Sequence, residues 1–161
     1  MARACQRGIV RPVFQRLLLP LSALLAIAAA DIALAQHAEN AAQAATRWGL
    51  PGTWKPDCRQ PASRANPAFT FVVREGQLYQ LRDLGDVQDT NLVTEASILP
   101  EGDLETTTVF AGAMVRTVVQ RKTGEGRFML WSNRVANTEN YSIKNGVMAN
   151  GASAPTLSRC R

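Results

Sequence analysis

The chain has 161 residues, with 18 basic and 13 acidic side chains and a formal net charge of +5, a length suited to one domain. Four of the arginines and one aspartate lie in the first 35 residues, so residues 36–161 carry a net charge of only +2. Nucleic-acid-binding domains usually carry a clustered basic patch. The mild charge therefore argues against that class, and we expect no nucleic-acid partner.

The first 35 residues have the pattern of a secretory signal peptide. Four arginines and no acid precede an apolar run of about 14 residues, Leu17–Ala30, and Ala33-Leu34-Ala35 supplies the small residues of a cleavage site. The run is shorter than the roughly 20 residues of a membrane span. Cys5 precedes the run, so no lipid-modified cysteine is expected. We therefore expect residues 1–35 to be removed, and the mature chain to be periplasmic or secreted without a transmembrane helix.

Two cysteines, Cys58 and Cys160, remain beyond the expected cleavage site. In an oxidising compartment an even number of cysteines indicates disulfides, and two cysteines allow one pairing. The alternative is a pair of free thiols. A zinc site is not expected, because two thiolates lack the further ligands that tetrahedral zinc requires.

Residues 36–49 are polar and rich in alanine, and we expect an arm or a short helix that ends at Gly49 and Pro51. From residue 50 onward, short runs of β-branched and aromatic residues alternate with turn residues, which is typical of strands. In Ala68–Glu75, for example, Phe69 and Phe71 share one side of the chain. The nine expected strands are Gly52–Cys58, Ala68–Glu75, Gln77–Leu84, Asn91–Leu99, Leu104–Phe110, Met114–Lys122, Arg127–Val135, Asn140–Lys144 and Thr156–Cys160.

The order of these strands predicts a closed fold. Successive strands joined by tight turns are antiparallel, and a disulfide requires Cα atoms roughly 6 Å apart. A bridge from Cys58 to Cys160 ties the first strand to the last, and these two strands are neighbours in a closed barrel. We therefore expect an all-β fold over residues 50–161. It would be a small antiparallel up-and-down β-barrel of about eight strands, closed by one disulfide, with a β-sandwich as the alternative.

Gly52-Thr53-Trp54, at the start of this antiparallel series, resembles the G-x-W opening of lipocalins and related calycin barrels. The resemblance implies that the glycine fits a tight bend and that Trp54 plugs the closed end of the barrel. It also implies an arginine near the end of the last strand that packs on the tryptophan, for which Arg159 is the counterpart. The export signal, the G-T-W sequence and the nearby cysteine also resemble small secreted β proteins of proteobacteria, a resemblance that implies no activity.

The usual catalytic groups are missing from the expected domain. The single histidine, His37, lies two residues beyond the expected cleavage site, so no Ser-His-Asp or Cys-His arrangement is expected. No glycine-rich phosphate-binding motif is present, and most of the acids fall at turns or strand ends, where solvated acids are expected. We therefore expect no enzymatic activity, no cofactor and no metal site.

The basic residues near one predicted hairpin allow two interpretations. Arg116, Arg121, Lys122 and Arg127 flank the Thr123–Gly126 turn. They form either an ordinary solvated hairpin or a local positive patch for an acidic partner such as an anionic membrane surface.

The aromatic and methionine residues suggest a binding role. Met114, Met129 and Met148 suit an adaptable apolar lining, and a closed barrel can hold a small molecule. We expect an exported, non-catalytic barrel that binds a small apolar ligand in the periplasm. The alternative is a protein-interaction module, such as an inhibitor of an envelope hydrolase, which would use the loop of residues 59–67. The aromatic residues expected in the core or against a ligand are Trp54, Phe69, Phe71, Phe128 and Trp131.

Overall fold

One short helix precedes the strands in the computed structural model, which describes residues 39–161. Helix α2 spans Ala41–Trp48 and begins with a capping box. The Asn40 side chain accepts from the Gln43 N–H at 2.9 Å, and the Gln43 side chain accepts from the Asn40 N–H at 3.2 Å. The helix ends at Gly49, whose φ of 92° is the left-handed conformation that glycine adopts readily. The described part of the expected arm is therefore helical. The expected signal peptide, Cys5 and His37 lie outside the described residues.

The rest of the described chain forms one antiparallel sheet, with a single turn of 3-10 helix, Ala111–Ala113, between two of its strands. The ten strands are β1 Gly52–Lys55, β2 Ala68–Arg74, β3 Gln77–Asp83, β4 Gln88–Ile98, β5 Leu104–Phe110, β6 Met114–Gly124, β7 Arg127–Val135, β8 Tyr141–Lys144, β9 Val147–Met148 and β10 Thr156–Cys160.

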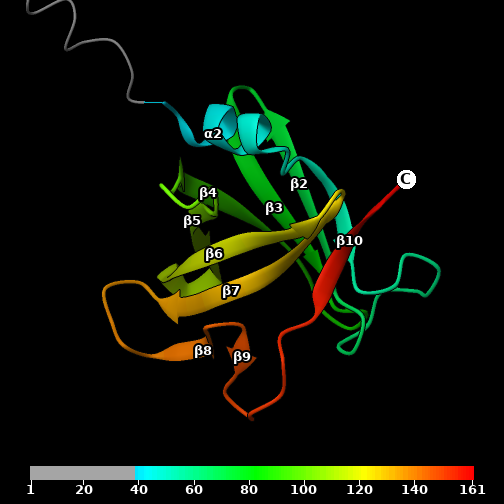
Figure 1. Cartoon of the computed structure of the whole chain (residues 1–161). Coiled ribbons are helices and arrows are strands. Elements are labelled where there is room, and N and C mark those ends of the chain that lie inside the picture. The colour runs from blue at the N-terminus through cyan, green and yellow to red at the C-terminus, as the bar shows by residue number, and fades with distance from the viewer. Residues whose placement is uncertain (1–38) are drawn as a thin grey trace, which may run out of the picture. The chain divides into compact units, whose positions relative to one another are not determined.

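Eight of these strands, β1 to β7 and β10, close into a barrel, whose course can be followed in Figure 1. Strands β1 to β7 pair in sequence order, and β10 pairs with both β1 and β7. Where β10 pairs with β1, Trp54 lies opposite Arg159, and where β10 pairs with β7, Leu157 lies opposite Phe128. Strands β8 and β9 form a hairpin attached to β7, outside the closed ring. The expected antiparallel β-barrel is confirmed, and the sandwich alternative is wrong.

The expected Cys58–Cys160 disulfide is present, with an S–S distance of 2.00 Å and Cα atoms 5.4 Å apart. The sequence predicted that Cys58 lies on the first strand, but in the structure it does not. Strand β1 ends at Lys55, directly before Pro56, because proline has no N–H for a further ladder bond. Cys58 therefore sits in the turn after β1 and reaches the end of β10, where Cys160 pairs with Thr53.

The hydrophobic core lies at the end of the barrel next to helix α2 (Figure 1). The Trp48 ring lies 5.8 Å from the Phe128 ring, and the Trp54 ring lies 4.6 Å from it, measured between centroids. Both indole N–H groups are satisfied by backbone carbonyls, Trp48 by Gly102 and Trp54 by Leu50, at 2.8 and 2.7 Å. Helix and strands together fill this end of the barrel, so any interior space lies towards the other end.

Candidate functional site

The filled end of the barrel is braced by an arginine stacked on Trp54. The guanidinium carbon of Arg159 lies 5.5 Å from the centre of the Trp54 ring, and its Nη2 donates to the Pro51 carbonyl. Gly52 has a φ of 135°, and a Cβ at this position would lie 2.9 Å from Arg159 Nε. Only glycine therefore lets Arg159 approach this closely. The geometry places Gly52, Trp54 and Arg159 as a closing cluster at this end.

The other end of the barrel encloses a cavity of about 380 Å³. Its floor includes Phe128 and Leu157, which are 1 % exposed. Its outer part includes Met114, which is 43 % exposed, and Ser142, which is also exposed. The lining is of two kinds. Apolar side chains come mainly from β2, β6 and β7, and the polar side chains are Arg64, Gln80, Arg82, Arg116, Gln120, Asn133 and Ser142.

Two of the three arginines in the cavity wall are neutralised by carboxylates. Arg64 donates to Asp86 at 3.0 and 2.9 Å, and these hydrogen bonds hold the pKa of Asp86 below its usual value. Arg82 pairs with Asp89 through both of its carboxylate oxygens. Arg82 also lies over the Phe110 ring, with its guanidinium carbon 5.0 Å from the ring centre. Neither cation therefore needs a further anion.

Arg116 differs from the other two. It is half-buried, and it donates to the neutral side chains of Asn133 and Ser142, at 2.6 and 2.7 Å. Within residues 39–161 no carboxylate forms an ion pair with it. Burial and then the positive charge of Arg82 lower the pKa of Arg116. A guanidinium remains charged at neutral pH, so the cavity wall carries one positive charge without a counter-charge in the described part of the chain.

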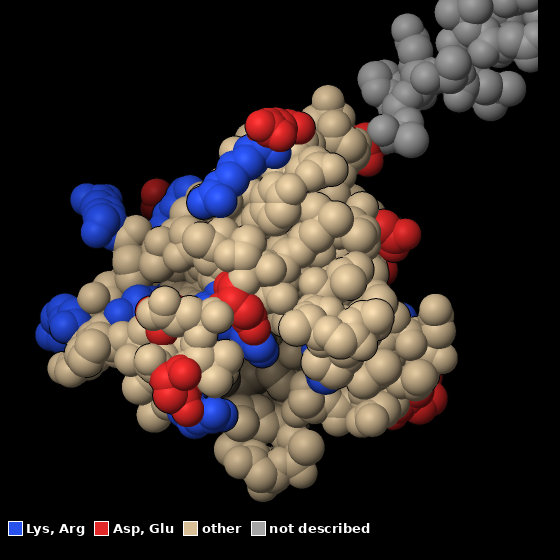
Figure 2. Space-filling view, turned by 180° about the vertical axis from the view of Figure 1, so that it is seen from behind, with Lys and Arg blue, Asp and Glu red and all other residues tan. Residues whose placement is uncertain are grey.

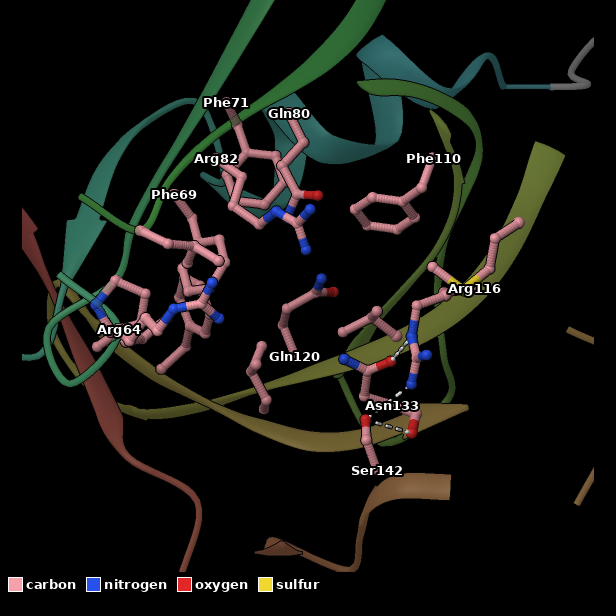
Figure 3. A pocket seen from close by; sticks show the side chains of 17 residues that line it. Arg64, Phe69, Phe71, Gln80, Arg82, Phe110, Arg116, Gln120, Asn133 and Ser142 are labelled. Atoms are coloured by element: carbon pink, nitrogen blue, oxygen red, sulfur yellow. Dashed lines mark hydrogen bonds between the residues drawn. The ribbon is translucent and has the colours of Figure 1, made fainter. Parts of the chain in front are cut away.

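Two glutamines in the cavity wall have an unsatisfied amide oxygen. Oε1 of Gln80 and Oε1 of Gln120 are buried and accept no hydrogen bond from the described residues. Gln120 is 2 % exposed, and its amide nitrogen donates to Thr106 Oγ1 at 3.0 Å. In Figure 3 the ends of Gln80 and Arg82, both from β3, point towards the middle of the cavity from one side, and the end of Gln120, from β6, points towards it from the opposite side. A buried acceptor without a partner costs about 1–3 kcal/mol, so these amides mark a place suited to a donor.

The structure separates the five aromatic residues that the sequence singled out. Phe69, Phe71 and Phe128 line the cavity. Trp54 lies in the core at the filled end. Trp131 does not line the cavity, and the guanidinium carbon of Arg121 lies 3.7 Å from its ring centre. The aromatic contribution to the cavity therefore comes from the phenylalanines.

The structure also separates the three methionines, and the four basic residues near one hairpin, that the sequence grouped together. Of the three methionines expected to line a binding site, only Met114 lines the cavity; Met129 and Met148 do not. The expected grouping of Arg116 with the basic residues at the hairpin is wrong. Arg116 lies six residues before Lys122 on β6, which is about 20 Å along a strand. Lys122 lies over the Trp48 ring at 4.8 Å, and Arg121 pairs with Asp103.

Loop 59–67 is ordered by one buried side chain at its end. Asn66 is 9 % exposed; its amide oxygen accepts from the Asp57 N–H at 2.9 Å, and its amide nitrogen donates to three carbonyls. The loop contributes Arg64 and, with Pro67, a part of the cavity wall. The loop expected to serve a protein partner is thus also a part of the cavity.

The sequence contained a signal for the polar wall that the expectations did not use. Leu78, Gln80 and Arg82 alternate on β3, and the buried Leu78 fixes this face as the inner one. Polar residues that continue an inward alternation indicate a polar cavity. On β7 the alternation itself changes, because the pairing of β6 with β7 shifts by one residue. Val119 of β6 pairs with Ser132, and the next residue, Gln120, pairs with Leu130. In a strict alternation Asn133, five residues after Phe128, would lie on the opposite face, but with this shift it lines the same cavity as Phe128.

Other kinds of site are not seen in the part of the chain that the structure describes. Residues 39–161 contain no group of three or more His, Cys, Asp or Glu placed to hold a metal ion. No helix in this range has the length and hydropathy of a membrane span. On the face shown in Figure 2, basic and acidic side chains lie near one another and form no single basic patch. No family model, curated protein or solved structure matches the chain.

Proposed function

We propose that the mature chain acts outside the cytoplasm as a non-catalytic, lipocalin-like barrel that binds a small molecule with an apolar part. The observation that carries the proposal is the cavity of about 380 Å³ with Phe69, Phe71 and Leu130 in its wall. Ligand sites are concave, largely apolar and equipped with a few polar groups that fix orientation. Closure by β10 and the disulfide makes the wall continuous, so the site is formed before the ligand arrives.

The closing cluster supports the lipocalin-like part of the proposal. Arg159 stacks on Trp54, and Gly52 leaves room for it, which is the arrangement that the G-x-W resemblance implies. A barrel that is filled at one end and hollow at the other binds its ligand in the hollow part. The export signal predicted in residues 1–35 and the disulfide are consistent with an oxidising compartment.

The test measures binding of the apolar dye Nile red to protein purified from the periplasm, followed by fluorescence. Leu130→Trp fills part of the cavity, and Val72→Trp places the same ring on a β2 position outside the cavity lining. We expect Leu130→Trp to weaken binding about tenfold or more, and Val72→Trp to change it by less than about twofold. Equal binding by both variants, or no binding by the unaltered protein, would overturn the proposal.

A further inference from the structure

Two of the polar groups that line the cavity lie at different levels of one strand, β6. Arg116, Val118 and Gln120 all line the cavity from β6. Arg116 lies near the outer part, next to the exposed Ser142, and Gln120 lies deep, at 2 % exposure. Four residues of a strand span about 13 Å. The apolar Val118 separates the two polar levels.

The outer level is suited to an anion. Arg116 carries the positive charge that no carboxylate of residues 39–161 neutralises. Its two hydrogen-bond acceptors, Asn133 and Ser142, are neutral and hold the guanidinium in place. Burial already lowers the pKa of Arg116, which means that its charged form lacks full solvation. A carboxylate at this position would supply the missing counter-charge through charge-assisted hydrogen bonds.

The deep level is suited to a hydroxyl group. Gln120 uses its amide nitrogen on Thr106 and leaves its oxygen without a partner. A hydroxyl donates to such an oxygen, and a methyl group at the same place cannot. Gln80 presents a second unsatisfied oxygen in the cavity wall, visible in Figure 3 beside Arg82.

We infer that the ligand is an amphipathic organic acid with a polar group at each end, a carboxylate held by Arg116 and a hydroxyl held by Gln120. Its apolar middle lies against Val118, Phe69 and Leu130. This inference rests on the proposed function, because it names the class of molecule that the same cavity takes. It adds a direction of binding, with the acid outward and the hydroxyl inward.

The test is competition against Nile red by three molecules of equal chain length: decanol, decanoate and ω-hydroxydecanoate. We expect decanoate to bind roughly tenfold more tightly than decanol, and the ω-hydroxy acid several-fold more tightly again. Arg116→Met should remove the advantage of decanoate over decanol, and Arg116→Lys should restore part of it. Arg74→Met makes the same change in net charge at an exposed position on β2 and should alter none of the three affinities.

The deep contact has its own variant. Gln120→Leu should bring the ω-hydroxy acid to the affinity of decanoate and leave the preference for decanoate over decanol unchanged. The two proposals fail in different ways. If the dye itself does not bind, both fail; if the dye binds in the cavity but none of the three molecules displaces it, the two-ended ligand fails and the proposed function stands. If decanol binds as tightly as both acids, and Arg116→Met alters no affinity, the two-ended ligand is wrong although the apolar site remains.

Discussion

Removal of the Cys58–Cys160 disulfide tests how the barrel is held closed. The two cysteines lie 102 positions apart, so the bond closes nearly the whole domain into one loop. For a loop of this length, the loss of chain entropy in the unfolded state is worth about 4.7 kcal/mol. That is about a third or more of the 5–15 kcal/mol that stabilises an ordinary domain. The bond also anchors β10, a strand of five residues that completes the ring between β1 and β7.

The perturbation is the double variant Cys58→Ala/Cys160→Ala, compared with the oxidised protein in urea. With a urea slope of about 1.5 kcal/mol per M, a loss of about 4.7 kcal/mol lowers the unfolding midpoint by about 3 M. Circular dichroism reports the transition, and the unaltered protein reduced with dithiothreitol is the control. A midpoint within about 0.5 M of that of the oxidised protein would show that the bond constrains neither the unfolded chain nor the closing strand.

Three further substitutions test separate parts of the structure by the same urea measurement. Gln120→Leu removes a buried acceptor without a partner, which costs the folded state about 1–3 kcal/mol, and also the hydrogen bond to Thr106, worth about 1 kcal/mol. The net result should be a rise in the free energy of unfolding of about 1 kcal/mol; a fall of more than about 1.5 kcal/mol, which exceeds the value of the lost bond, would show that the amide oxygen is satisfied. Arg121→Met leaves the Asp103 carboxylate, 6 % exposed, without its cation and should lower the free energy of unfolding by about 3 kcal/mol. Adding Asp103→Asn should recover a part of this loss. Gly146→Ala places a Cβ 2.8 Å from Met129 at a φ of 73° and should cost more than Gly151→Ala, which has a φ of 84° and no close neighbour; equal costs would contradict the contact.

Much of the strand order was predictable, because turns and alternation are local properties of the sequence. Gly76, between two of the expected strands, and Asn145-Gly146, directly after the expected strand Asn140–Lys144, all have the positive φ of turn residues. The inward positions of Phe69 and Phe71 follow from their spacing of two on β2. The closed ring was predictable from the cysteine pairing, because the bond requires the beginning and the end of the strand series to lie side by side.

The composition of the cavity was harder to predict, because it depends on register across the barrel. The shift between Val119 and Gln120 changes which β7 residues face inward, and no local pattern announces it. The hairpin of β8 and β9 lies outside the ring, although its sequence resembles that of the barrel strands. Arg116 looked like one of several basic residues of a hairpin. Only the tertiary structure shows that it faces a cavity without a carboxylate partner among residues 39–161.

The most direct test of the central claim, that the hollow end of the barrel binds a two-ended organic acid, is an NMR titration of the backbone amides with ω-hydroxydecanoate. If this claim holds, saturable shifts occur at the residues flanking Arg116 and Gln120 on β6, and at Phe69 and Phe71 on β2. Amides of helix α2 and of the β8–β9 turn should stay unchanged. Shifts confined to the outer surface, or no saturable shift at any amide, would contradict it.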